Sequence, residues 1–102
     1  MAYKLSSLAA EDFAEIYEYT LVNFGELHAQ SYLLDLEKIM DLLVSSPMIG
    51  YECDDISEGV RRFNHNHHAL FYRIIKKDNL SSDVVIVRIL HQQMNPHLYF
   101  PS

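Results

Sequence analysis

Four arginines carry the strongest chemical signal in this sequence, because they fall in three β-rich runs that follow one another closely. Arg61 and Arg62 open the first run, Arg73 lies in the second and Arg88 in the third, with His91 just beyond it. Strands joined by short links tend to be neighbours in a sheet, so we expect at least some of these guanidinium groups to converge on one face. Half-buried guanidinium groups need acceptors, which are carboxylates of this chain, carboxylates of a partner, or phosphates.

These arginines allow two interpretations. In the first, arginine, histidine and a tyrosine such as Tyr99 support metal-free cleavage of RNA, in which His91 or Tyr99 moves protons and the arginines stabilise the charged phosphorane. The candidate catalytic residues are then Arg61, Arg73, His91 and Tyr99. In the second interpretation the arginines form inter-strand ion pairs with the acidic loop before Gly59, and their role is structural.

Other candidate chemistry is weaker. His65 and His67, in the run His65-Asn66-His67-His68, could share a face and bind one metal ion, but no cysteine lies nearby. Exposed histidines in a surface turn are the simpler interpretation, so we expect no metal and no other cofactor. Cys53 lies among acidic residues, which should raise its pKa rather than activate it as a nucleophile.

Charge is distributed unevenly along the chain. Residues 1–58 hold twelve acidic and two basic residues, a net charge of -10, whereas residues 59–102 hold six basic and two acidic residues, a net charge of +4. Four acids of the first half, Glu11, Asp12, Glu15 and Glu18, crowd one predicted helix and are expected to form its solvated face. A net acidic chain gains little from a phosphate backbone, so no direct binding of nucleic acid is expected. The bipolar charge is better suited to a protein partner.

The hydrophobic pattern predicts one α+β domain over residues 1–102. Hydrophobic residues make up 49% of the chain, which is enough for one compact core. Apolar residues recur at helical spacing in the first half, and the period changes to that of strands after residue 58. The expected elements are a strand over 2–6, a helix that begins after Ser6 or Ser7 and ends at Gly25, a helix from 26 to about 44, a loop over 45–58, and strands at 60–63, 68–75 and 84–90. The predicted order is β-α-α-β-β-β, with an antiparallel sheet packed against an α-helical hairpin.

Two of the predicted strands are apolar on both faces. The runs 68–75 and 84–90 alternate little between apolar and polar residues, which is typical of strands covered on both sides. One helix hairpin covers only one face of a sheet. The other face must be covered by the tail over 96–102, by another copy of the chain, or by a partner, and this is the clearest sign from the residues that the protein works in a complex.

The sequence predicts a cytoplasmic protein. No apolar run approaches the roughly 20 residues of a membrane helix, so no membrane partner is expected. The N-terminus lacks the apolar core of a signal peptide. A lone cysteine forms no internal disulfide, which favours a reducing compartment.

Three stretches of the sequence resemble the ParE toxins of the RelE/ParE superfamily. They are the run from Cys53 to Phe63, the run from His68 to Arg73, and the run from Val87 to Met94. The opening Tyr3-Lys4-Leu5-Ser6 and the segment Pro47-Met48-Ile49-Gly50 fit the same family. The resemblance covers nearly the whole chain, and its most specific part is the segment from Arg88 to Met94.

The resemblance implies the toxin of a bacterial type II toxin–antitoxin system. Such a toxin inhibits DNA gyrase by stabilising its cleaved-DNA complex and so arrests growth, without being an enzyme itself. A ParD-like antitoxin would neutralise it in a hetero-oligomer, with an acidic arm facing the arginines. The alternative is a RelE-like ribosome-dependent mRNA endoribonuclease, which His91 and Tyr99 keep open. The candidate contacts with the target or the antitoxin are Arg61, Arg62, Arg73, Arg88, His91, Met94, Leu98, Tyr99 and Phe100.

Overall fold

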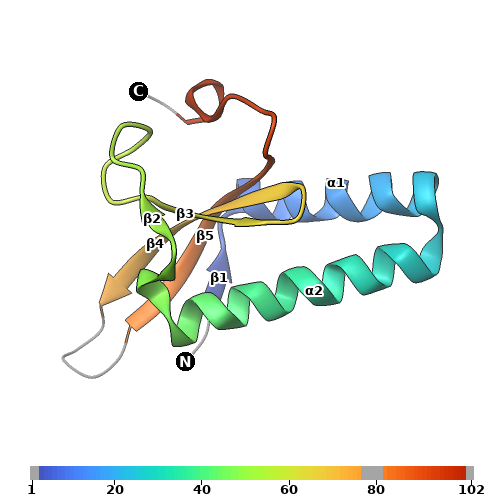
Figure 1. The fold of residues 1–102 in the computed structure, drawn as a ribbon, viewed down its shortest axis with the longest axis horizontal. Coiled ribbons are helices and arrows are strands. Elements are labelled where there is room, and N and C mark those ends of the chain that lie inside the picture. The colour runs from blue at the N-terminus through green and yellow to red at the C-terminus, as the bar shows by residue number, and fades with distance from the viewer. Residues whose placement is uncertain (1–2, 77–81, 101–102) are drawn as a thin grey trace.

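The computed structural model describes residues 3–76 and 82–100, and it confirms the α+β class and the order of the predicted helices and strands (Figure 1). Residue 2 of the predicted first strand and most of the link between the last two predicted strands lie outside the described residues. The elements are β1 (Tyr3–Leu5), α1 (Ser7–Phe24), α2 (Glu26–Ser45), the 3-10 helix η1 (Pro47–Ile49), β2 (Tyr51–Glu52), β3 (Arg61–His65), β4 (His68–Lys76), β5 (Ser82–His91) and the 3-10 helix η2 (Pro96–Leu98).

The two helices begin and end where local chemistry predicts. Ser6 is the N-cap of α1, and its hydroxyl accepts a hydrogen bond of 3.0 Å from the backbone N–H of Ala9. Gly25 ends α1 with φ of 91°, in the left-handed region that glycine adopts without strain, and its N–H donates to the carbonyl of Leu21. Because α2 begins at the next residue, the helices form the expected hairpin. Neither they nor any other described helix is long and apolar enough to cross a membrane.

The predicted antiparallel meander of the last three strands is confirmed, because β4 pairs antiparallel with both β3 and β5. Beyond this, the sheet differs from the prediction in two respects. Its order is β1-β5-β4-β3-β2, and β1, whose placement the sequence leaves open, pairs with β5 in parallel. The helix hairpin lies between β1 and the remaining strands in the sequence and carries the chain across the sheet. This long connection allows β1 and β5 to run in the same direction. The second difference is β2, which lies inside the predicted loop and pairs with β3. A strand of two residues has no periodicity to read.

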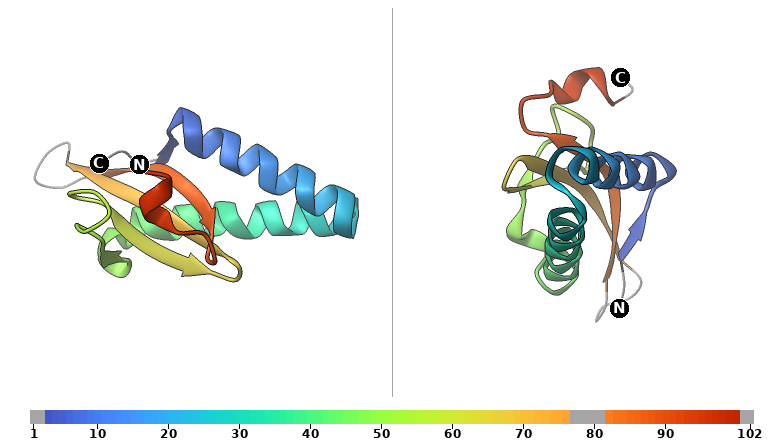
Figure 2. Two further views of the ribbon diagram at one scale, coloured as in Figure 1. Left: turned by 90° about the horizontal axis from the view of Figure 1, so that it is seen from above. Right: turned by 90° about the vertical axis from the view of Figure 1, so that its right-hand side faces the viewer.

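The helix hairpin covers one face of the sheet, and its far end extends beyond the sheet (Figures 1 and 2). The core between these layers is built from fully buried side chains of α2 and the central strands, including Leu36, Leu43, Tyr72 and Ile86. This core holds the helix hairpin on the sheet. It thereby places α1 alongside the end of β5, where the candidate site lies.

The chain itself covers the opposite face of the sheet. Phe71 and Leu90 are buried there beneath the loop that contains Cys53 and beneath the tail, where Tyr99 and Phe100 pack. The rings of Phe71 and Phe100 meet edge to face with centroids 5.3 Å apart. The sequence left three candidates to cover this face: the tail, another copy of the chain, or a partner. In the structure, the tail covers it. The need for a partner therefore does not follow from this face.

Candidate functional site

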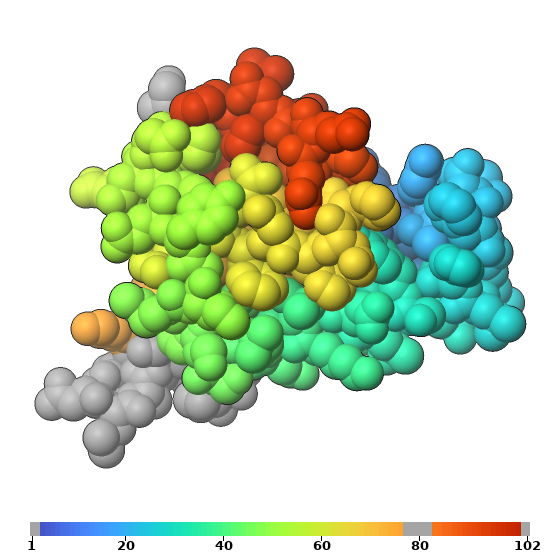
Figure 3. Space-filling model, in the orientation of Figure 1, coloured from blue at the N-terminus to red at the C-terminus, as the bar shows by residue number. Residues whose placement is uncertain are grey.

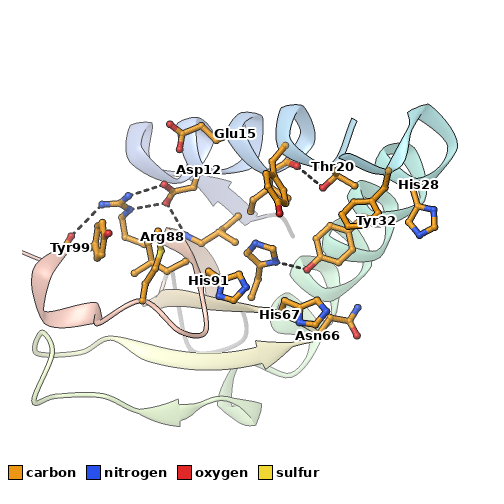
Figure 4. A pocket seen from close by; sticks show the side chains of 17 residues that line it. Asp12, Glu15, Thr20, His28, Tyr32, Asn66, His67, Arg88, His91 and Tyr99 are labelled. Carbon is orange, nitrogen blue, oxygen red and sulfur yellow. Dashed lines mark hydrogen bonds and ion pairs between the residues drawn. The ribbon is translucent and has the colours of Figure 1, made fainter. Parts of the chain in front are cut away.

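A pocket of about 820 Å³ lies between the helix hairpin, the turn that joins β3 to β4, the end of β5 and the tail (Figure 4). In the space-filling view this region is hollowed between the far end of the hairpin and the C-terminal segment (Figure 3). Its lining residues are Asp12, Glu15, Ile16, Tyr19, Thr20, Phe24, His28, Tyr32, Asn66, His67, His68, Arg88, Ile89, Leu90, His91, Met94 and Tyr99.

The β3–β4 turn brings three histidines together. Asn66 adopts a positive φ of 53°, which asparagine tolerates better than most residues, and this allows a tight turn before His67. The N–H of Gln92 donates to the carbonyl of His67, so the turn lies against the end of β5. The ring of His91 stacks on His67 with centroids 6.2 Å apart and meets the edge of His68 at 5.6 Å.

Arg88 and Asp12 form a mostly buried ion pair at one end of the pocket. Two nitrogens of the Arg88 guanidinium donate to the two carboxylate oxygens of Asp12, each at 2.8 Å. One of these oxygens also accepts the backbone N–H of Ile89 at 3.0 Å. Arg88 further donates to the carbonyl of Tyr99 and lies over its ring, so the pair joins α1, β5 and the tail. The hydrogen bonds with Asp12 raise the pKa of Arg88.

Asp12 corrects one expectation from the sequence. The prediction placed it on a solvated helix face with Glu11, Glu15 and Glu18, but it is only 7% exposed. Asp12 precedes the buried Ile16 by four residues, so both belong to the same face of α1. The three glutamates are exposed as expected.

His68 and Tyr32 form a hydrogen-bonded pair inside the pocket, with 2.5 Å between the Tyr32 hydroxyl and Nδ1 of His68. Burial lowers the pKa of His68 to about 4, and the neighbouring His91, His67 and His65 add to this effect. Burial also raises the pKa of Tyr32, with a contribution from Asp35. His68 is therefore neutral at pH 7, and its tautomer sets which of the two groups donates in this hydrogen bond.

We expect His68 to make the fold sensitive to acid. Its pKa rises from about 4 in the folded chain to about 6.5 in the unfolded chain. The unfolded state therefore binds more protons in this window, and stability falls as the pH drops from 6.5 to 4. Such a shift corresponds to about 3 kcal/mol for a fully buried ring, and partial exposure reduces this to about 1–2 kcal/mol. Urea unfolding at pH 7 and pH 4.5 should show this extra loss in the wild type relative to His68→Gln. Equal losses in the two proteins would contradict the prediction.

The four arginines do not assemble into one site. Arg62 and Arg88 pair with Phe71 from either side and so share a face, but Arg62 lies over the Phe71 ring and donates to Asn64, away from the pocket. Arg61 belongs to the opposite face, where Tyr72 is its partner in the register. The expected convergence is therefore limited to a shared side of the sheet.

Two of the arginines bind the loop that precedes β3. Arg61 donates to the carbonyl of Gly50 through Nη2 at 2.6 Å and forms an ion pair with the exposed Glu52 at 3.5 Å. Arg73 donates to the hydroxyl of Ser57 at 2.8 Å and to the backbone carbonyl of Glu58. These contacts agree with the structural interpretation of the arginines, although most of the acceptors are backbone carbonyls rather than carboxylates.

The remaining predicted contact residues fall in three places. His91, Met94 and Tyr99 line the pocket, Phe100 packs on Phe71, and Leu98 is 77% exposed on η2. The wall that α1 contributes to the pocket was not predicted from the sequence. The spacing of Asp12, Glu15, Ile16, Tyr19 and Thr20 was the available signal, because residues three and four apart share a helix face.

Among residues 3–76 and 82–100, the side chains are not arranged to support metal or thiol chemistry. No group of three or more histidine, cysteine or carboxylate side chains there is placed to hold a metal ion. Cys53 is buried, and burial raises its pKa first, with Asp55 adding to the effect. The predicted direction is confirmed, and its main cause is burial rather than the acidic neighbours.

Comparison with known proteins gives a consistent result. The family model of the ParE toxin of the type II toxin–antitoxin system parDE matches residues 3–96. Two curated relatives, each named Toxin ParE1, align over 93 residues, which is 91% of this chain and 91% of the relative. The protein from Mycobacterium tuberculosis is 34% identical and that from Caulobacter vibrioides is 30% identical.

Two solved structures share the fold. A chain from the chromosomal ParDE toxin–antitoxin system of P. aeruginosa matches with a TM-score of 0.71 and 23% identity, over 89% of this chain and 95% of that chain. A chain from the toxin–antitoxin complex RelBE2 of Mycobacterium tuberculosis matches with a TM-score of 0.56 and 21% identity, over 89% and 96%.

Proposed function

Because the chain belongs to the ParE toxin family of type II toxin–antitoxin systems, we propose that it inhibits DNA gyrase by stabilising the cleaved-DNA complex and that a ParD-like antitoxin neutralises it. The match over residues 3–96 supports a ParE-type toxin, because it spans both described α-helices and every described strand. The two structurally similar chains come from toxin–antitoxin systems, which supports an antitoxin partner. This action belongs in the cytoplasm, where gyrase meets the chromosome.

The ion pair between Arg88 and Asp12 is the observation that favours a protein target over RNA cleavage. A nuclease site needs a cation that is free to hold the phosphate. Arg88 is the one arginine that lines the described pocket, and Asp12 neutralises it at 2.8 Å. Glu15 adds a negative charge to the same pocket. The two arginines of the candidate catalytic set, Arg61 and Arg73, do not line the pocket and bind the loop before β3 instead.

A cleavage assay with gyrase tests this proposal. Purified chain, supercoiled plasmid, gyrase and ATP are incubated, and protein-linked linear DNA is scored after the protein is denatured. We expect linear DNA to accumulate with increasing chain and to disappear when the antitoxin is added first. His91→Gln should act like the wild type, because a gyrase inhibitor needs no general acid or base.

The exposed tail offers a test of the docking surface. Leu98 is 77% exposed on η2, so Leu98→Asp should leave the fold intact while it weakens contact with an apolar partner surface.

Two outcomes of the cleavage assay would contradict the proposal or replace it. Wild-type chain that is folded yet yields no linear DNA would contradict the gyrase target. Cleavage of mRNA on ribosomes that is lost in His91→Gln would establish the nuclease alternative instead.

A further inference from the structure

The end of the helix hairpin that carries Gly25 projects beyond the sheet (Figures 1 and 2). On α1 the last buried residue of the core against the sheet is Ile16, and on α2 the first is Leu36. The end of α1 at Phe24 lies about 12 Å past Ile16, at 1.5 Å per residue. Residues 17–31 therefore form a protrusion, which we call the hairpin tip.

The two most exposed large apolar side chains among the described residues lie on the hairpin tip. Leu27 is 85% exposed and Val22 is 78% exposed. Neither belongs to the core on either side of the sheet, and neither lines the pocket. Tyr19 and Phe24 on the same tip are 63% and 61% exposed. Large apolar side chains that gather on one protruding element mark a surface that gains free energy when another molecule covers it.

The charge of the hairpin restricts which molecule covers its tip. Across residues 7–45 the hairpin holds eight acidic residues and one lysine, a net charge of -7. Asp12 forms the ion pair with Arg88 and raises its pKa, and Glu11 and Glu15 add to this effect. The other five acidic residues leave the hairpin negative. Such a hairpin repels DNA, an anionic membrane surface and the same hairpin of a second copy, and it attracts a basic protein surface.

We propose that the hairpin tip is a docking surface for gyrase, which receives it in an apolar hollow flanked by basic residues. This inference rests on the proposed function, since it names a contact through which the same inhibition occurs. An enzyme that holds DNA carries cationic side chains along the path of the duplex, so its surface there is complementary in charge to the hairpin. Val22 and Leu27 enter the hollow, and the exposed Glu18 and Glu26 face lysine or arginine residues at its rim.

Glutamine substitutions at the tip test the apolar part of the inference, because glutamine removes apolar surface, adds no charge and is a good helix former. Val22→Gln/Leu27→Gln is compared with the wild type and with the control Met48→Gln/Ile75→Gln, which changes exposed apolar residues on η1 and β4. Linear DNA is measured against chain concentration in the gyrase cleavage assay. We expect the tip variant to need about 10-fold more chain for half-maximal cleavage, and the control less than about 3-fold more, at unchanged melting temperatures.

Charge reversal tests the electrostatic part. Glu18→Lys/Glu26→Lys changes the tip, and the control Glu37→Lys/Asp41→Lys makes the same change in net charge at exposed positions of α2 beside the buried core. We expect the tip pair to weaken binding to gyrase about 5-fold or more and the control pair by less than about 2-fold. The difference should shrink between about 50 and 500 mM NaCl, because salt screens exposed charges.

Antitoxin binding separates the two proposed partners. The antitoxin is titrated by calorimetry into Val22→Gln/Leu27→Gln, and we expect its affinity to stay within about 3-fold of the wild-type value. A tip variant that yields linear DNA at the wild-type concentration would overturn the inference, and weaker antitoxin binding by that variant would assign the tip to the antitoxin instead. A folded wild-type chain that yields no linear DNA would contradict the gyrase target itself, and the inference with it.

Discussion

Replacing Asp12 with alanine is expected to lower the free energy of unfolding by about 3–5 kcal/mol, the cost of breaking a buried ion pair by removing one partner. The side chains of Arg88 and Asp12 are only 15% and 8% exposed, so Arg88 would be left with little solvent to replace the lost carboxylate. The N–H of Ile89 would lose its acceptor as well. Because Arg88 also holds Tyr99, the tail should detach more readily from α1 and β5.

Urea unfolding of four proteins would measure this effect. Arg88→Met should destabilise the fold about as strongly as Asp12→Ala, because it leaves the carboxylate of Asp12 buried without its partner. The double variant Asp12→Leu/Arg88→Met should lose less than the sum of the single losses, since no buried charge remains. Glu15→Ala is the matched control, an exposed acid three residues further along α1, and should change stability by less than about 0.5 kcal/mol. A loss below about 1 kcal/mol in Asp12→Ala would show that the pair does not hold these elements together.

The fold was predictable wherever local chemistry determines it. Ser6 and Gly25 mark the ends of α1 because a hydroxyl cap and a positive φ are properties of single residues. The direction of β1 relative to β5 depends instead on how the helix hairpin carries the chain across the sheet, which no local pattern encodes. The strand β2 exists because β3 is there to pair with it, so its two residues carry no signal of their own.

The site was less predictable than the fold, because the type of a residue does not determine which hydrogen-bond or ion-pair partner its side chain has in the folded chain. At least some of the arginines were expected to share a face, and Arg62 and Arg88 do, yet their guanidinium groups bind different segments. Asp12 was assigned to solvent since acids on a helix usually are exposed. Its role depends on Arg88, which lies 76 residues further along the chain.

Gly50→Ala is the second substitution with a large expected effect, a loss of about 3 kcal/mol in the free energy of unfolding. A Cβ at Gly50 would lie 2.5 Å from the hydroxyl of Tyr72 and 2.7 Å from the backbone carbonyl oxygen of Arg62. Tyr72 is fully buried, and its hydroxyl donates to the carbonyl of Pro47 at 2.7 Å while it accepts the N–H of Gly50 at 2.9 Å. The added methyl group would displace this hydroxyl and with it the attachment of η1 to the sheet.

Gly50 also binds the side chain of Arg61. The carbonyl of Gly50 accepts two hydrogen bonds from the Arg61 guanidinium, at 3.1 and 2.6 Å, so any shift of residue 50 also disturbs Arg61. Toxicity lost on mutation of Arg61 would therefore report on stability as much as on contact with the proposed target. Binding assays on Arg61 variants need the melting temperature measured alongside.

Thermal unfolding of Gly50→Ala should be compared with that of Gly25→Ala, because the two glycines are needed for different reasons. Nothing lies within 4 Å of a Cβ at Gly25, and its positive φ of 91° is the only obstacle, which costs about 1 kcal/mol. A loss of about 3 kcal/mol at Gly50 corresponds to a melting temperature roughly 12–20 °C lower. Equal losses in the two variants would mean that backbone conformation, rather than the contact with Tyr72, makes glycine necessary at position 50.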